Sequence, residues 1–334
     1  MRASDAMSAI TAIVPTQRPA LFKGPPGCGK SQIVEQVARN LGADLLISHP
    51  VTEDPTDPKG MPWFQDGKAE FVPFGTLRRA MEATAPTIWL LDDLGQAPTA
   101  VQAAYMQLLL ARRVNGHVLS DSVYMLATTN RQQDRAGVNK IITPLLNRFV
   151  HLELEVSVDD WQAWALSANI APDVHSFIRF RPALLMQFDP TSGQESFPTP
   201  RSWEFVSQIA GVTPDSLLLP VVAGCVGEGP AAEYIAFRRL YTQLPDPLTV
   251  LANPQGTTVP TDPAVLYALI GALVERAKTA TDPQINALAL FAGRMSAEYG
   301  TLLIRDTIAV NQRAFGQPGV SDWVRKHADL FATR

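Results

Sequence analysis

Two hydrophobic patterns alternate over the first 155 residues of the chain. Short apolar runs are typical of strands buried on both faces, and the segments between them carry apolar residues at helical spacing. In the segment 30–41, for example, Ile33, Val34 and Val37 lie on one helical face and Gly42 marks the end of the helix. The apolar runs occupy residues 20–24, 44–50, 86–93, 123–130 and 149–155. Alternating strands and helices predict an α/β fold with a parallel, doubly wound sheet.

Beyond residue 156 the strand pattern stops and the segments are helical. The predicted helices occupy residues 158–169, 172–188, 200–211, 229–244, 264–277 and 284–308. A proline-rich stretch at 243–262 indicates a second, softer boundary. We therefore expect an α/β domain at 1–155, a helical domain at 156–242 and a helical C-terminal extension at 243–334.

Three further local elements are predicted within the α/β domain. Residues 4–14 have the pattern of a short helix. Residues 50–75 are rich in Pro, Asp and Gly and predict a long loop that carries a short hairpin. The Asn-Gly dipeptide in VNGHVLSDS, residues 114–122, predicts a second hairpin.

Composition narrows the class of protein. Hydrophobic residues make up 46% of the 334 positions and charged residues 18%, which is typical of a globular chain with a substantial core. The net charge of −4 and the lack of a polybasic run do not favour nucleic acid as a partner. Cys28 and Cys225 form no CxxC pair, so we expect neither a disulfide framework nor a zinc ribbon, and a cytoplasmic location. We expect no secretion signal and no membrane span.

The stretch GPPGCGKS, residues 24–31, carries the strongest chemical signal. It matches G-x-x-x-x-G-K-[ST] and lies between a predicted strand and a predicted helix. In such a loop, backbone N–H groups surround a phosphate chain and the helix N-terminus adds its positive dipole. Lys30 is expected to reach the β- and γ-phosphates and Ser31 to offer its hydroxyl to Mg²⁺. The binding residues predicted here are Gly24, Pro25, Pro26, Gly27, Cys28, Gly29, Lys30 and Ser31.

Cys28 occupies a position of the loop that carries no assigned role, and we interpret it as a small filler. We still expect bulky thiol reagents to affect the loop. Two acids complete the nucleotide chemistry, because Asp92 and Asp93 follow the apolar run IWLL. Asp92 is predicted to bind the metal ion and Asp93 to orient or deprotonate the attacking water.

Three more polar residues follow in order. Asn130 ends the apolar run MLATTN, Arg148 follows the helical PLLN, and Arg201 lies at the start of a helix in PTPRSWEF. Arg148 has a plain alternative, a salt bridge at a helix end, and Arg201 could be an ordinary first-turn arginine. A helix N-terminus is an unfavourable place for a cation, however, which favours a nearby anion.

This ordered set resembles the AAA+ ATPases, in particular the MoxR-like branch, over residues 18–210. The resemblance implies a P-loop NTPase core followed by an α-helical lid, with ATP and Mg²⁺ as cofactors. It assigns Lys30 and Ser31 to Walker A, Asp92 and Asp93 to Walker B, and Asn130 to sensor 1. Arg148 is similar to the arginine finger that acts on a neighbouring subunit, and Arg201 is similar to sensor 2.

The resemblance also implies an assembly and a partner. A finger that acts across subunits implies a ring, with six subunits expected. In MoxR-like systems the ring remodels or activates a client, often one with a von Willebrand A domain. The segments 60–75 and 114–122 lie where this branch carries two pore elements. Trp63 and Phe64 are interpreted either as pore aromatics or as residues packed under their loop.

One departure from the family pattern leaves alternatives open. The second Walker B acid is Asp93 rather than glutamate, which predicts slow hydrolysis, because a misplacement of about 1 Å can lower a rate about a hundredfold. A nucleotide-gated scaffold with little turnover is therefore one alternative. A nucleic-acid motor or loader is another, and DNA-stimulated, salt-dependent ATPase activity would favour it.

Overall fold

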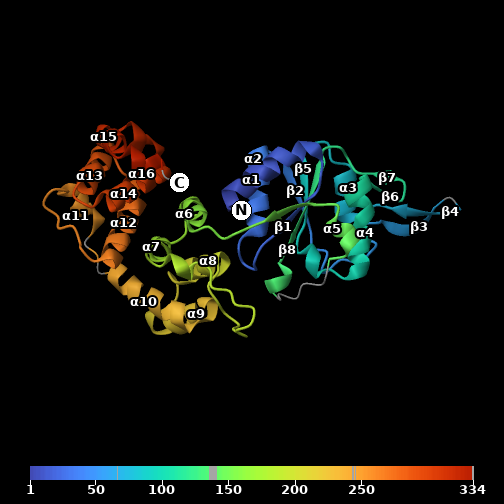
Figure 1. Cartoon of the computed structure of the whole chain (residues 1–334), viewed down its shortest axis with the longest axis horizontal. Helices are drawn as coiled ribbons and strands as arrows, with labels where there is room; N and C mark the ends of the chain where they lie inside the picture. Colours follow the sequence, from blue (N-terminus) through green and yellow to red (C-terminus); the bar gives the residue numbers. More distant parts are fainter. Residues whose placement is uncertain (66, 135–140, 243, 245, 333–334) are drawn as a thin grey trace. The chain divides into compact units, whose positions relative to one another are not determined.

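A computed structural model describes residues 1–65, 67–134, 141–242, 244 and 246–332. The chain separates into two compact units. The first contains residues 1–157 and 188–193, and the second contains residues 158–187 and 194–334 (Figure 1). We predicted a lid at 156–242 and an extension at 243–334. Both assignments stay predictions.

A five-stranded parallel sheet forms the centre of the first unit. Its strands lie in the order β2-β5-β8-β1-β9, and every neighbouring pair is parallel. The strands are β1 (Ala20–Lys23), β2 (Asp44–Ser48), β5 (Thr87–Leu91), β8 (Val123–Thr129) and β9 (Val150–Glu153). β5 and β8 are buried along their whole length, as their apolar runs predicted.

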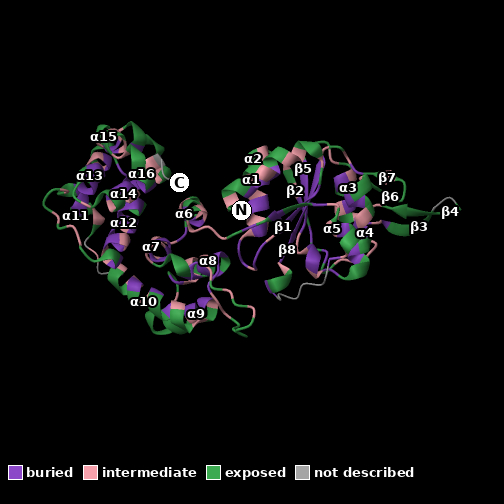
Figure 2. Ribbon diagram, viewed as in Figure 1, coloured by how far each residue is buried: buried purple, intermediate pink, exposed green. Residues whose placement is uncertain are grey.

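Helices cover both faces of this sheet (Figures 1 and 2). Side chains of a strand alternate between faces, so Phe22 of β1 packs with the helices on one side and Leu21 with those on the other. The first side carries α1 (Ala3–Ile13) and α2 (Lys30–Leu41), and the second carries α3 (Gly75–Met81), α4 (Thr99–Ala111) and α5 (Thr143–Leu146). Short 3-10 turns lie at Val14–Thr16, Leu94–Gln96 and Gln132–Asp134. The predicted doubly wound α/β fold is confirmed.

Two antiparallel hairpins extend this unit, and both were predicted. One pairs β3 (Met61–Gln65) with β4 (Lys68–Val72). The other pairs β6 (Arg113–Val114) with β7 (His117–Val118). Asn115 and Gly116 between β6 and β7 both have positive φ, +48° and +87°, as an Asn-Gly turn requires.

The second unit is helical, as predicted for the chain beyond residue 156. Its helices are α6 (Val158–Ser167), α7 (Pro172–Phe180), α8 (Pro200–Ile209), α9 (Asp215–Val226), α10 (Glu228–Thr242), α11 (Pro247–Ala252), α12 (Pro263–Ala277), α13 (Asp282–Ala292), α14 (Ala297–Val310), α15 (Pro318–Lys326) and α16 (Ala328–Ala332). Short 3-10 segments lie at Pro182–Leu184 and Gln312–Gly316. None of the helices in the described ranges is long and apolar enough to cross a membrane.

Helix α7 joins the two halves of the helical unit. Phe177 packs its ring against Trp203 of α8 and Tyr234 of α10, with centroid distances of 5.4 and 5.5 Å. On the same helix, Arg179 forms a buried ion pair with Asp306 of α14. The segment before residue 242 and the segment after it therefore share contacts through one helix.

Two helix predictions were inaccurate in their bounds, and one helix was not predicted. The helix expected at 172–188 ends at Phe180, because Pro182 follows and removes a backbone donor. The helix expected at 284–308 is two helices, α13 and α14, since Gly293 caps the first and Ser296 begins the second. The proline-rich stretch after residue 243 contains a short helix, α11, whose first turn is capped by the Asp246 carboxylate.

Candidate nucleotide-binding site

The glycine loop leaves the carboxyl end of β1 and enters α2. Gly24 lies so close to its surroundings that an added Cβ would stand 3.0 Å from the Cys28 Sγ and 3.3 Å from the Leu154 side chain. Gly27 and Gly29 have φ of +72° and +90°, which side chains other than glycine rarely adopt. The loop conformation therefore explains each of the three glycines.

Lys30 folds back into the loop. Its Nζ donates hydrogen bonds to the carbonyl oxygens of Gly24 (3.2 Å) and Pro25 (3.1 Å) and to the Asn130 Oδ1 (2.8 Å). Both Lys30 and Asn130 are buried, with 8% and 7% of their surfaces exposed. The structure thus brings together two predicted residues that lie 100 positions apart in the sequence.

Ser31 and Asp92 also meet. The Ser31 hydroxyl donates to the Asp92 carboxylate, with distances of 2.9 and 3.0 Å to the two oxygens. The carboxylate accepts a second hydrogen bond from Thr128 Oγ1 at 2.5 Å. Thr128 was not predicted, although a hydroxyl within the apolar strand β8, two residues before Asn130, was a usable signal.

Asp93 is placed by a backbone turn. It has φ of 54° and ψ of 38°, a left-handed conformation, and its N–H donates to Thr128 Oγ1 at 2.9 Å. A left-handed conformation is unusual for a residue other than glycine, although Asp tolerates it better than most. The turn begins the 3-10 segment Leu94–Gln96 and carries the chain away from the sheet.

The site is suited to a triphosphate and to a magnesium ion. Mg²⁺ prefers oxygen ligands, and Ser31 and Asp92 present a hydroxyl and a carboxylate side by side. Lys30 supplies the cation, and the N-terminus of α2 points its backbone N–H groups into the loop. These residues would hold the ion, which would neutralise phosphate charge. The part of the chain that the structure describes has no cluster of three His, Cys, Asp or Glu for a different kind of metal site.

Cys28 and Arg131 are two further titratable residues, one in the loop and one directly after Asn130. Burial raises the pKa of the Cys28 thiol, although Lys30 opposes the shift. The thiol is 8% exposed, so the expected effect of thiol reagents needs the loop to open. Arg131, which the sequence analysis missed, follows Asn130 and pairs with Asp134 (2.9 Å) and Glu153 (3.8 Å).

Arg148 lies between α5 and β9. One guanidinium nitrogen donates to the Pro144 carbonyl, which ties the side chain to the turn before it. Over the described ranges, Arg148 has no acidic partner within ion-pair distance. The alternative reading of a salt bridge at a helix end therefore has no support among these residues.

Arg201 belongs to the helical unit. It is exposed at the second position of α8, between Thr199 and Ser202, which form the capping box of this helix. The loop and the acids lie in the other unit, so the sensor 2 role of Arg201 stays a prediction.

The exposure of Trp63 and Phe64 in the β3–β4 hairpin separates the two interpretations, pore aromatics or residues packed under their loop. Trp63 is 62% exposed and Phe64 72%, so neither packs under its loop. Cross-strand partners share a face, which places Trp63 on one face and Phe64 with Phe71 near it on the other. The His117 Nε2 forms a hydrogen bond with the Phe71 carbonyl at 2.7 Å, so the two hairpins touch. Figure 2 shows the β3–β4 hairpin as exposed.

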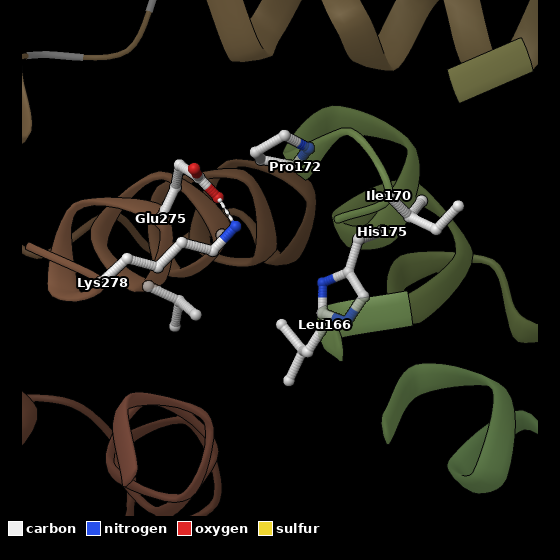
Figure 3. Close-up of a pocket in the computed structure, with 8 residues that line it drawn as sticks. Leu166, Ile170, Pro172, His175, Glu275 and Lys278 are labelled. Carbon is white, nitrogen blue, oxygen red and sulfur yellow. Dashed lines mark ion pairs between the residues drawn. The ribbon is translucent and has the colours of Figure 1, made fainter. Parts of the chain in front are cut away.

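The helical unit contains a small cavity between α7 and α12, distinct from the loop (Figure 3). It is lined by Leu166, Ile170, Pro172, His175, Gly271, Val274, Glu275 and Lys278. Among the described residues, no group forms a hydrogen bond with the buried His175 Nε2, and burial lowers the pKa of His175 to about 3. His175 is therefore neutral near pH 7.

Comparison with known proteins agrees with this geometry. Residues 19–149 match the AAA domain family of the dynein-related subfamily. Midasin from Giardia intestinalis is 28% identical over 170 residues, which is 48% of this chain but only 3% of midasin. Residues 19–149 are therefore similar to an AAA domain, and this similarity agrees with the P-loop fold of the first unit.

Solved structures are more distant. Brucella abortus NtrX in complex with ADP has a TM-score of 0.39 and 13% identity, covering 99% of this chain and 68% of NtrX. A RuvB mutant from Thermotoga maritima has a TM-score of 0.41 and 14% identity, covering 85% of each chain.

Proposed function

We propose that the chain is a magnesium-dependent ATPase of the MoxR-like type, whose ATP hydrolysis remodels or activates a separate partner protein in the cytoplasm. The observation that carries the ATPase assignment is the meeting of Lys30 with Asn130 and of Ser31 with Asp92 at one edge of the sheet. Lys30 would bind the phosphates, Asp92 the metal ion, and Asp93 the attacking water. Arg201 would sense the bound nucleotide from the helical lid.

Turnover of ATP by the purified protein tests this assignment. We expect Lys30→Ala to abolish nucleotide binding, and Asn130→Ala to keep binding but lower turnover. Lys68→Ala is a matched control, because Lys68 is an exposed lysine of β4 in the same unit. Phosphate release in wild-type protein that persists unchanged in Lys30→Ala would refute the assignment.

We propose that the working form is a ring, with six subunits expected. The support is Arg148, a guanidinium without an acidic partner in the described ranges, which would complete the site of a neighbour. Mixing two inactive variants tests this directly. A Lys30→Ala subunit keeps Arg148, and an Arg148→Ala subunit keeps its loop. If the finger acts between subunits, the mixture regains turnover that neither variant has alone. A mixture that stays inactive, although it assembles, would contradict the finger.

We propose that the two hairpins contact the client, which in relatives often carries a von Willebrand A domain. Trp63 and Phe64 present large apolar side chains to solvent, and exposed apolar patches mark interaction sites. Trp63→Ala with Phe64→Ala should remove stimulation by the client and leave basal turnover unchanged. Leu290→Ala with Phe315→Ala removes two exposed apolar side chains from the helical unit and is the control.

One observation favours a slower, switch-like form of the same function. Asp93 is shorter than glutamate and lies in a left-handed turn, so water activation depends on how that turn directs its carboxylate. A scaffold gated by bound ATP would show tight binding and turnover below about one per minute, far under the median of about 10 per second for enzymes. If the short side chain of Asp93 slows hydrolysis, Asp93→Glu should raise turnover. Unchanged turnover in Asp93→Glu would exclude side-chain length as the cause of slow hydrolysis.

A further inference from the structure

Thr128 is a buried hydroxyl with two partners in the nucleotide site. It is 0% exposed in β8, a strand whose other residues are also buried. Buried polar groups need hydrogen-bond partners. Thr128 finds both of its partners in the acid pair that follows β5.

The two hydrogen bonds act on different acids. The hydroxyl donates to the Asp92 Oδ1 and accepts from the Asp93 N–H. Strand register explains the contact, because Leu91 of β5 is paired with Ala127 of β8 and the next positions are Asp92 and Thr128. A hydroxyl has one donor and two acceptor sites, so a single threonine can make both bonds.

The contact to Asp93 bears on backbone conformation. Asp93 has left-handed backbone angles, and its backbone N–H donates a hydrogen bond to Thr128 Oγ1. The direction in which the Asp93 side chain leaves the backbone depends on this conformation. The contact to Asp92 is also distinct from that of Ser31, because Ser31 belongs to the loop whereas Thr128 belongs to the sheet.

We propose that Thr128 is the positioning residue of the acid pair: its hydroxyl orients the Asp92 carboxylate for the metal ion and holds Asp93 in the turn that aims its carboxylate. The proposal rests on the function proposed above. Thr128 acts through the two acids and does not itself touch nucleotide.

Nucleotide affinity measured with and without magnesium tests the role apart from turnover. The probe is a fluorescent ATP analogue, titrated in Mg²⁺ and in EDTA. Thr128→Val keeps the shape and removes both hydrogen bonds. We expect it to keep the affinity in EDTA, to lose most of the tightening by Mg²⁺, and to lower kcat by about 10- to 100-fold, the range for hydrogen bonds to charged groups.

Two further variants test whether the loss of kcat and of the magnesium effect follows the hydrogen-bonding strength of the side chain at position 128. Thr128→Ser keeps the hydroxyl and should retain kcat and the magnesium effect within about threefold, since the bonds remain. Thr128→Cys keeps the volume but has a weaker donor and acceptor, so it should fall between serine and valine. If the valine variant fails to fold, the serine–cysteine comparison still decides.

Thr87→Val is the matched control. Thr87 is 4% exposed at the opposite end of β5, and its hydroxyl bonds the Ala85 carbonyl at 2.9 Å. The same substitution there removes a buried hydroxyl away from the acids and should leave the magnesium effect intact.

Three results would overturn the proposal. Thr128→Val could behave as wild type, or Thr87→Val could lose the magnesium effect equally, or serine could fail to rescue. A wild-type protein without magnesium-dependent nucleotide binding would overturn the proposed function as well, so the two failures are distinguishable.

Discussion

The buried ion pair between Arg179 and Asp306 gives the sharpest stability prediction. The side chains are 10% and 3% exposed, and they join α7 to α14. Removing one partner of a buried pair leaves a buried charge without its close counter-ion, which costs about 3–5 kcal/mol. Arg305 also lies 3.6 Å from the Asp306 carboxylate, but its side chain is 56% exposed and compensates weakly. Replacing both partners by apolar residues removes both charges and is often neutral.

We therefore expect Arg179→Met to destabilise the helical unit by about 3–5 kcal/mol, and Arg179→Met with Asp306→Leu to recover most of that loss. For a domain of 150–250 residues, each 1 kcal/mol lowers Tm by about 2–4 °C. The single variant should thus melt about 6–20 °C lower in differential scanning calorimetry.

The residue that follows the same helix supplies the control. Arg181 pairs with Glu233 of α10 at 2.5 Å, but these side chains are 48% and 43% exposed. An exposed pair contributes less than about 1 kcal/mol, so Arg181→Met should change Tm by only a few degrees. The reasoning is refuted if the double variant melts as low as Arg179→Met, or if Arg181→Met destabilises the unit as strongly.

Three further predictions concern packing, pH and reactivity. Gly271→Ala would place its Cβ 1.8 Å from the Ser176 Oγ, so we expect loss of the helical unit's stability in urea unfolding, partly restored by Ser176→Ala. Burial holds the pKa of His175 at about 3, below the unfolded value near 6.5, so the unfolded chain binds the proton first as pH falls. The contribution of neutral His175 to the free energy of unfolding should be complete above pH 6.5 and fall by up to about 1.4 kcal/mol per pH unit between 6.5 and 3. Urea titrations of His175→Phe should lack this slope. Cys28 should react slowly with a bulky maleimide and faster in urea, since it is buried and its thiolate is disfavoured; rapid labelling of native protein would contradict this.

The parts of the fold that the sequence predicted depend on local signals. Strands buried on both faces are continuous apolar runs, so β5 and β8 were recognisable as they stand. The glycine loop was recognisable because its residues are consecutive and their spacing carries the chemistry. The β6–β7 hairpin was predicted for the same reason, since Asn115 and Gly116 specify its turn within two residues. The β3–β4 hairpin was predicted only from the Pro, Asp and Gly content of residues 50–75.

The misses come from contacts between distant segments. Thr128 looked like an ordinary strand residue because its partners follow β5, and the sequence does not state that β5 and β8 are neighbours. Arg131 pairs locally with Asp134, but its contact with Glu153 of β9 joins segments that the sequence does not place together. The division between α13 and α14 was missed because apolar residues continue at helical spacing on both sides of Gly293.

Strand β8 links the two halves of the nucleotide site. It lies between β5 and β1 in the sheet. Its Thr128 contacts the acids, and Asn130, which directly follows the strand, contacts Lys30. An ammonium group has three donors, and among the described residues the oxygens of Gly24, Pro25 and Asn130 accept from Lys30. A phosphate that binds Lys30 must therefore displace or share at least one of them. Asn130 is the one side chain among these acceptors, and it directly follows β8, whose Thr128 contacts the acid pair. We therefore expect phosphate binding to alter the Lys30–Asn130 hydrogen bond first.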